Sequence, residues 1–188
     1  MRFEESPLPG CYLIQPEVRP DERGRFVKTF SREAFLARGL ECDWVESFYS
    51  VSRRGVLRGL HFQLPPHHHA KLVHCSHGRL FDAVVDLRRG SPTQGRFATF
   101  ELEAELGNQV YIPAGCAHGC YALTESATIV YHVTSAHAPR HDAGIRWDSA
   151  GIPWPDDHPV MSVRDREHPP MGDFVSPFEM PEGLPHDH

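Results

Sequence analysis

The chain carries fourteen histidines among its 188 residues, a high number for its length. An imidazole changes its charge near neutral pH, so it serves as a general acid or base and also as a metal ligand. Three segments that contain histidine or lysine stand out: GVLRGLHFQ at 55–63, KLV at 71–73 and IPAGCAHG at 112–119. Acid/base chemistry and metal chemistry are therefore the two possibilities to weigh first.

The run His67–His69 is the best candidate for a metal site. Together with His118, the imidazoles of His67 and His69 would supply three nitrogen ligands of the kind that zinc and other transition metals accept. However, no glutamate follows at the spacing that would complete such a set, and the cationic Lys71 lies close by and would repel a metal ion. We therefore expect no functional metal, and a solvated loop at 67–69.

With Tyr131 and GIRW at 144–147, the three segments resemble the dTDP-4-dehydrorhamnose 3,5-epimerase family. The ordered combination RGLHxQ, KLV, DLR, IPxGxAHG and GIRW is highly specific, and the likeness runs from about residue 21 to residue 165. The resemblance implies a mainly β, cupin-like jelly-roll barrel with a few short helices. It also implies a homodimer with sites near the subunit interface, no cofactor or metal, and a nucleotide-linked 4-keto-6-deoxyhexose as substrate.

The chemistry of such a substrate determines what the protein must supply. The C4 ketone acidifies the protons on C3 and C5, so inversion needs a base on one face, an acid on the other and a group that stabilises the enolate. By resemblance His61 is the base, and Asp165 orients its ring and stabilises the imidazolium. Lys71 matches the group that stabilises the enolate, and Tyr131 matches the acid.

The resemblance also implies a set of substrate-binding residues. Arg58 is expected to contact the diphosphate and His118 to line the sugar cavity. Arg23 and Phe26 match nucleotide-binding residues that reach across from the partner subunit. The full set of expected binding residues is Arg23, Phe26, Lys28, Glu46, Arg58, Gln63, His118 and Arg146.

The chain departs from the family pattern where the nucleotide base is held. Lys28 replaces a residue that is usually acidic, Glu46 begins a run that is usually Gln-Asp-Asn, and tyrosines are missing near Ala136 and His137. Thymine offers an N–H donor between two carbonyl oxygens, whereas cytosine offers an amino donor beside a ring acceptor. Both a dTDP carrier with divergent packing and a CDP or other carrier are consistent with these changes.

Three alternatives to inversion at both C3 and C5 of a dTDP-linked sugar stay open. One is inversion at a single position of a CDP-linked or other nucleotide-linked 4-keto-deoxysugar. Another is a metal-dependent cupin oxygenase or isomerase, which stoichiometric iron, manganese or nickel in the purified protein would identify. The last is a sugar-nucleotide binding module without catalysis, since a single histidine, lysine or tyrosine in a strand is more often a surface or hydrogen-bonded residue.

The elements that must position these residues are mainly strands. Apolar and polar residues alternate at 79–87 and 97–102, and glycine or proline turns recur at short intervals between such stretches. Asp82 and Asp86 are expected on one face of the first stretch. Each could support the site, form a salt bridge or face a loop. One helix is expected from 32 to 38, with Ser31 as N-cap and Gly39 as the stop.

Composition excludes several other classes of protein. The net charge of −6 and the pI near 6.1 do not fit a nucleic-acid-binding surface, and no apolar run is long enough to cross a bilayer. The first ten residues lack a secretory pattern, so we expect a cytoplasmic protein with its five cysteines reduced. We also expect a single domain over 1–188 that ends in an irregular, partly mobile tail from about residue 166.

Overall fold

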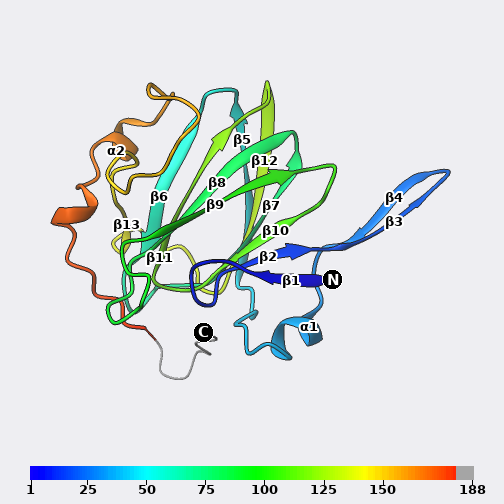
Figure 1. The fold of residues 1–188 in the computed structure, drawn as a ribbon, viewed down its shortest axis with the longest axis horizontal. Coiled ribbons are helices and arrows are strands. Elements are labelled where there is room, and N and C mark those ends of the chain that lie inside the picture. Colours follow the sequence, from blue (N-terminus) through cyan, green and yellow to red (C-terminus); the bar gives the residue numbers. More distant parts are fainter. Residues whose placement is uncertain (181–188) are drawn as a thin grey trace.

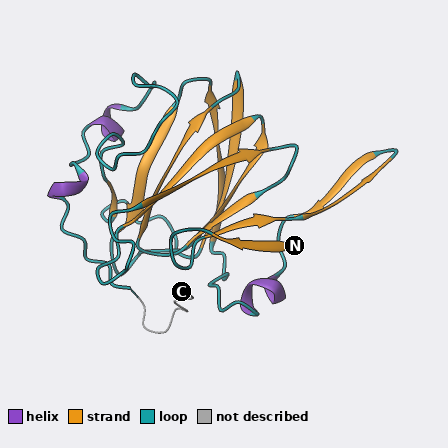
Figure 2. Cartoon of the chain, viewed as in Figure 1, coloured by secondary structure: helices purple, strands orange, loops and turns teal. Residues whose placement is uncertain are grey.

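The computed structural model, which describes residues 1–180, contains two antiparallel β-sheets that face each other (Figures 1 and 2). The first sheet has six strands, in the spatial order β1 (Arg2–Glu5), β2 (Tyr12–Gln15), β10 (Gln109–Ile112), β7 (Lys71–His77), β12 (Ser126–Val133) and β5 (Glu46–Arg53). The second sheet has five, in the order β13 (Asp142–Gly144), β6 (Leu57–Gln63), β11 (Cys116–Ala122), β8 (Arg79–Asp86) and β9 (Phe97–Glu103). The predicted mainly β architecture is confirmed.

The alternation seen in the sequence along β8 corresponds to the two faces of the second sheet. Leu80 and Val84 point inward and pack with residues of the opposite sheet, whereas Ala83 and Val85 pack on the outer side. This is the period of two that a pleated strand imposes on its side chains. Asp82 shares the inward face with Leu80 and Val84, which brings a carboxylate into the interior of the sandwich.

The predicted helix is confirmed in position but is shorter than expected. Helix α1 (Arg32–Leu36) begins after Ser31, which is its N-cap as predicted, although the Ser31 side chain makes no capping hydrogen bond. The chain turns away through Gly39, whose φ of +67° suits a glycine. Phe35, the buried residue of the helix, packs edge-on against neighbouring aromatic rings and covers one end of the first sheet.

The C-terminal segment is largely irregular, and part of it packs against the second sheet. After α2 (Val163–Arg166), its only regular element within the described residues is the 3-10 helix η1 (Met171–Asp173). The rings of Phe174 and Phe178 nevertheless pack against Phe62 on the outer face of the second sheet, and Phe178 is buried. This part of the tail is therefore irregular but packed against the sheet, and the remainder, residues 181–188, lies outside the described residues.

A two-stranded hairpin, β3 (Glu17–Asp21) and β4 (Gly24–Lys28), projects away from the sandwich (Figure 1). Its strands pair only with each other. Arg25 attaches one side of the hairpin to the body by donating hydrogen bonds to the backbone oxygens of Ala104 and Glu105, at 2.8 and 2.6 Å. Phe26, on β4, is 60% exposed.

The five cysteines are free, buried thiols, as predicted for a reduced protein. No helix within residues 1–180 is long and apolar enough to span a membrane.

Candidate active site

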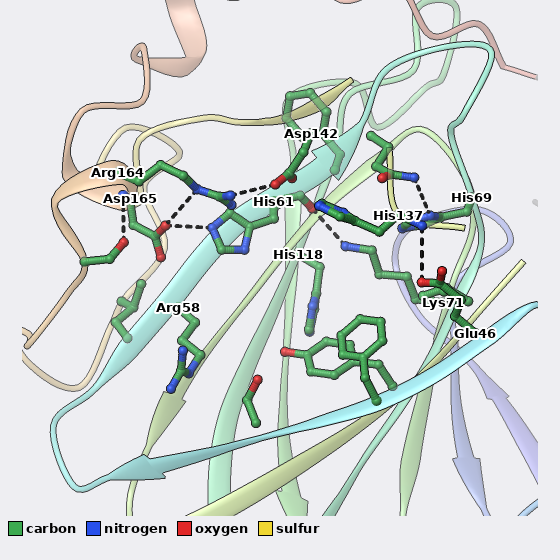
Figure 3. Close-up of a pocket in the computed structure, with 18 of the residues that line it drawn as sticks. Glu46, Arg58, His61, His69, Lys71, His118, His137, Asp142, Arg164 and Asp165 are labelled. Carbon is green, nitrogen blue, oxygen red and sulfur yellow. Dashed lines mark hydrogen bonds and ion pairs between the residues drawn. The ribbon is translucent and has the colours of Figure 1, made fainter. Parts of the chain in front are cut away.

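A pocket of about 720 Å³ lies between the two sheets, large enough for a small organic ligand. Its walls come from β5, β7 and β12 of the first sheet and from β6 and β11 of the second, and the segment around α2 closes one side. Figure 3 shows polar side chains from both sheets converging on this space. The expected site residues that line it are Glu46, Arg58, His61, Gln63, Lys71, His118, Tyr131 and Asp165.

His61 and Asp165 form a pair, although 104 positions separate them in the sequence. Nε2 of His61 lies 2.9 Å from Oδ1 of Asp165, and the backbone N–H of Gly59 donates to the other carboxylate oxygen at 3.2 Å. The hydroxyl of Ser162 accepts a hydrogen bond from the Asp165 N–H, which anchors the turn of α2 that carries the carboxylate. The geometry matches a base that a buried carboxylate orients.

Two glycines allow β6 and β11 to approach closely beside this pair. A Cβ on Gly59 would lie 2.5 Å from the Cα of Gly119, and Gly59 has a φ of +131°, which side-chain-bearing residues rarely adopt. The strand pairing that results sets His61 opposite His118. The glycine of the RGLH motif is therefore needed to form the site as well as to turn the chain.

The electrostatics of the pair favour an ionised Asp165. Burial alone would raise the pKa of Asp165, but the hydrogen bonds from His61 and Gly59 outweigh burial and hold the pKa below its usual value. A carboxylate only accepts hydrogen bonds, so Nε2 of His61 carries the proton that it donates to Asp165. In the neutral His61 ring the lone pair is then on Nδ1. The His61 side chain is 27% exposed and lines the pocket.

Lys71 approaches the pair from the opposite sheet. Its side chain is buried, and Nζ donates a 3.0 Å hydrogen bond to the backbone oxygen of His61. Burial lowers the pKa of Lys71 to about 8, and the carboxylates of Asp142 and Asp82 limit the drop. A buried ammonium group at this position can stabilise a nearby anion strongly.

His118 and Tyr131 complete the interior of the pocket. Nε2 of His118 lies 2.7 Å from the buried Oδ2 of Asp82, and its ring meets the Tyr131 ring edge-on at 5.8 Å. Burial is the main cause that raises the pKa of Tyr131 well above its usual value, and the nearby Cys120 and Asp82 raise it further. The phenol therefore keeps its proton at neutral pH, and Phe48 stacks on its ring at 4.9 Å.

Comparison with known proteins identifies the family. A family model for dTDP-4-dehydrorhamnose 3,5-epimerase matches residues 5–173, which is most of the chain. The chain belongs to this epimerase family. The dTDP-4-dehydrorhamnose 3,5-epimerase of Methanothermobacter thermautotrophicus is 41% identical to it over 175 residues, which cover 90% of this chain and 94% of that protein.

Solved structures of such epimerases superpose closely on this one. RmlC of Legionella pneumophila, in complex with dTDP-4-keto-L-rhamnose, is 30% identical with a TM-score of 0.90 and covers 96% of this chain and 99% of its own. ChmJ of Streptomyces bikiniensis, a 3'-monoepimerase in complex with dTDP-quinovose, is 36% identical with a TM-score of 0.84, over 89% and 86%. The predicted family, the cupin-like fold and an epimerase activity on nucleotide sugars are thereby confirmed.

Within this epimerase, two of the expected binding residues that line the pocket are largely committed to protein contacts. The amide of Gln63 donates to the backbone oxygens of His67 and Ala136 and accepts from the N–H of Ala138, so it holds together the loops at the pocket rim. Arg58 donates to the Ser52 hydroxyl at 2.9 Å and to a backbone oxygen of β5 at 3.1 Å. These hydrogen bonds hold its guanidinium against the wall of the pocket.

Four expected binding residues lie outside the pocket. Arg146 is paired with the adjacent Asp148, and the structure does not bring it to the epimerase pocket. The other three, Arg23, Phe26 and Lys28, lie on the projecting hairpin, away from the pocket of their own chain. A binding role for these three requires a second subunit.

The two aspartates of β8 differ in role. Asp82 faces the pocket residue His118, whereas Asp86 binds Arg88, Ser91 and a neighbouring threonine in a buried cluster away from the pocket. Asp82 therefore supports the site, and Asp86 holds a turn.

The histidine run at 67–69 does not form a metal site with His118. The rings of His67 and His141 have centroids 4.5 Å apart, and His69 contacts Gln63 and Ser135. His118 is hydrogen-bonded to Asp82. Burial, with the charge of Lys71, lowers the pKa of His69 to about 3.

Sequence reasoning missed His168, Arg164 and Asp142. Arg164 donates to Asp142 at 2.6 Å and lies 3.6 Å from Asp165, at the edge of the pocket. His168 packs edge-on against His61, with ring centroids 5.7 Å apart. The only sequence signal was that His168 stands three positions after Asp165.

Proposed function

We propose that this epimerase inverts C3, C5 or both in a nucleotide-linked 4-keto-6-deoxyhexose, with His61 as base and Tyr131 as acid. The observation that carries the proposal is the arrangement of groups across the pocket. The pair of His61 and Asp165 belongs to the side formed by β6 and α2, whereas Lys71 and Tyr131 come from the opposite sheet. Inversion requires a base and an acid on opposite faces of the sugar ring, and this arrangement supports that assignment.

The proposed reaction begins when Nδ1 of His61 takes the proton from the carbon next to the ketone. Its electron pair moves into the carbonyl to give an enolate, and Asp165 stabilises the imidazolium through Nε2. The ammonium group of Lys71 stabilises the negative oxygen of the enolate. His118 lines the same pocket. Tyr131 then delivers a proton to the opposite face, after which the phenolate regains a proton and His61 loses its own to solvent.

Whether one or two carbons are inverted depends on how the sugar sits between base and acid. One structural relative is a 3,5-epimerase and another is a 3'-monoepimerase, so this fold supports both outcomes. The same His61 and Tyr131 would serve either carbon. We therefore propose the shared step, proton abstraction next to the C4 ketone, as the function of this pocket.

The carrier nucleotide is proposed to be dTDP or CDP, recognised near Glu46. Glu46 lines the pocket and accepts a 3.2 Å hydrogen bond from the backbone N–H of His137. A carboxylate only accepts hydrogen bonds, so it suits both the ring N–H of thymine and the amino group of cytosine. Calorimetry with the free nucleoside diphosphates distinguishes the two, and a clear preference for dTDP would mean that Lys28 and Glu46 reflect divergent packing only.

We also propose that the protein works as a homodimer in the cytoplasm. Strand β5 is an edge strand of the six-stranded sheet, and apolar side chains are exposed on it and just before it. They are Val45, Phe48, Tyr49 and Val51, with exposed fractions of 60%, 47%, 68% and 55%. Burying such an edge against a second copy removes both the apolar surface and the unpaired strand.

The projecting hairpin fits the same proposal. Arg23, Phe26 and Lys28 do not line their own pocket, and the hairpin that carries them extends beyond the sandwich (Figure 1). A symmetric dimer that places each hairpin against the other subunit would bring these side chains to the partner's pocket.

The test is proton exchange in heavy water with dTDP-linked and CDP-linked 4-keto-6-deoxyglucose. The unmodified protein should introduce deuterium at C3, C5 or both. His61→Asn should lower the rate of incorporation about 100-fold to 10,000-fold, the usual effect of removing a general base. His68→Gln, a change at an exposed histidine, serves as the control and should leave the rate unchanged. Near-normal exchange in folded His61→Asn would overturn the mechanism, and no exchange by the unmodified protein would indicate a binding module.

A further inference from the structure

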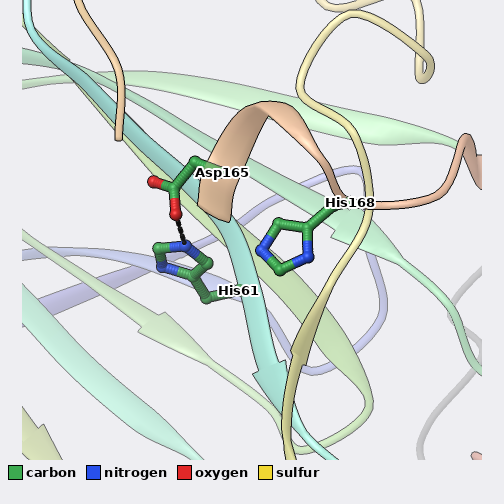
Figure 4. A group of neighbouring side chains, drawn as sticks. All are labelled: His61, Asp165 and His168. Carbon is green, nitrogen blue, oxygen red and sulfur yellow. Dashed lines mark hydrogen bonds and ion pairs between the residues drawn. The ribbon is translucent and has the colours of Figure 1, made fainter. Parts of the chain in front are cut away.

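The proposed base His61 belongs to a group of three neighbouring side chains of types that can bind a metal ion, together with Asp165 and His168 (Figure 4). One donor atom from each lies within 4.8 Å of the others. Two imidazoles and a carboxylate form a three-ligand set of the kind that holds zinc with one position open. Only His61 and Asp165 have a part in the proposed reaction, and His168 does not line the pocket.

His168 is held in place by the fold. Its ring lies over Gly144, where a Cβ would approach Nε2 of His168 to 2.5 Å, so only glycine leaves room for the ring. Among the described residues, Nε2 of His168 has no hydrogen-bond partner although the atom is buried. A buried ring nitrogen without a partner is an uncommon feature that calls for an explanation.

We infer that these three side chains form an inhibitory site for a divalent transition metal ion such as Zn²⁺. The ion binds between His61, Asp165 and His168, beside the substrate pocket. Oxygen and nitrogen ligands lie about 2.0–2.2 Å from zinc. Donor atoms of the three side chains lie within 4.8 Å of one another, and Nε2 of His61 is 2.9 Å from Oδ1 of Asp165, so small side-chain shifts are enough.

Binding of the ion would disable the base, an effect that rests on the proposed function of His61. In the metal-free pair the proton of the neutral ring is on Nε2 and the lone pair on Nδ1. When the ion takes the lone pair of Nε2, the single proton of the neutral ring must move to Nδ1. Nδ1 can then no longer accept a proton from the sugar, and no proton is gained or lost in the exchange.

The charges around the group set how strongly the ion binds. Asp165 supplies the negative charge of the ligand set, and Arg164 opposes it from 3.6 Å. Asp142 accepts from Arg164 at 2.6 Å and offsets part of that positive charge, while the charged end of Lys71 is directed to the backbone oxygen of His61. Arg164 is therefore the cation whose removal should strengthen metal binding most.

The first test is isothermal titration calorimetry with ZnCl₂ and no sugar nucleotide, which makes the result independent of the proposed activity. The protein should bind one ion with a Kd below about 100 μM. His168→Leu and His168→Gln should each weaken binding at least about tenfold, since even the loss of an outer-shell partner has that effect. Arg164→Gln should tighten binding about fivefold. His68→Gln is the control and should bind zinc as the unmodified protein does.

The second test is kinetic. Chelator-treated protein should keep full activity, and added Zn²⁺ should lower kcat with little change in KM, because the ion binds beside the pocket. The inhibition should be reversed by EDTA and be weakened in both His168 variants. Equal zinc affinity in His168→Leu, His168→Gln and the unmodified protein would overturn the inference, and so would competitive inhibition with unchanged kcat. Activity that is lost on chelation and restored by a metal would contradict both this inference and the proposed metal-free mechanism.

Discussion

At the scale of single residues, the two ring nitrogens of His61 have separate tasks. Nε2 is held by Asp165 at 2.9 Å, so the ring cannot rotate freely and the neutral form keeps its lone pair on Nδ1. Asp165 itself is held by the N–H of Gly59 and by the helical turn that Ser162 caps. A base with a fixed tautomer and orientation needs little rearrangement before it takes a proton.

Tyr131 should separate proton exchange from inversion. Tyr131→Phe keeps the ring and its stacking on Phe48 but removes the hydroxyl that is proposed to protonate the opposite face. Deuterium incorporation driven by His61 should continue, while net inversion at one carbon or more falls about 100-fold or further. NMR of the product in heavy water measures both quantities. Tyr12→Phe, outside the pocket, is the control, and full inversion by Tyr131→Phe would reject Tyr131 as the acid.

Lys71 should set the alkaline limit of activity. Burial holds the pKa of Lys71 at about 8, so the ammonium group is present below that pH and is lost as the pH rises through it. We expect kcat/KM to fall on the alkaline side near pH 8, since this ratio reports the free enzyme. Lys71→Arg should move this limb to higher pH because guanidinium stays charged. If an active Lys71→Arg variant shows the same alkaline fall in kcat/KM, another group must be responsible for that fall.

At the scale of elements, the close contact of β6 and β11 is a structural requirement. Gly59→Ala should lower the free energy of unfolding by about 2–5 kcal/mol, since it combines a disallowed φ with a Cβ 2.5 Å from Gly119. Gly90→Ala is the matched control: its φ is also positive, at +79°, but nothing lies within 4 Å of the added Cβ. That variant should lose only about 1–2 kcal/mol. Urea denaturation measures both, and equal losses would show that β6 and β11 can move apart.

The C-terminal segment is a second element with more than one task. Through Asp165 it orients the base, through Arg164 it borders the pocket, and through Phe178 it covers the outer face of the second sheet. Because packing and catalysis are joined in one short stretch of chain, the position of Asp165 depends on contacts made well beyond it. His168 lies between these two parts and contacts the base directly.

At the scale of the whole molecule, the proposed dimer predicts that damaged subunits complement each other. His61→Asn inactivates the pocket of its own chain, whereas Arg23→Ala should weaken the partner's nucleotide site. In a mixed dimer, one of the two sites then combines an intact pocket with an intact hairpin. Equal mixing with subunit exchange should therefore restore about a quarter of the unmodified activity. Activity no greater than the average of the two variants would contradict a hairpin that crosses to the partner.

The sequence by itself determined the family, the strands and most of the pocket. Alternation predicted β8 and β9 because one face of each sheet must be apolar, and turn residues marked where strands end. The ordered motifs identified His61, Lys71, His118 and Tyr131, since each motif carries its reactive side chain at a constant place on a strand. Even the pairing of His61 with Asp165 was predicted by resemblance, although the contact spans 104 positions.

Only the tertiary structure decided which polar groups are free to act. Gln63 and Arg146 stand in matching motifs, yet loop contacts occupy the first and Asp148 pairs with the second. His168 stands in no motif and still meets the base, because the chain beyond α2 folds back over Gly144. A motif records residue type and local spacing. Hydrogen bonding, burial and the approach of distant segments arise when the chain packs, and these determine what each side chain can do.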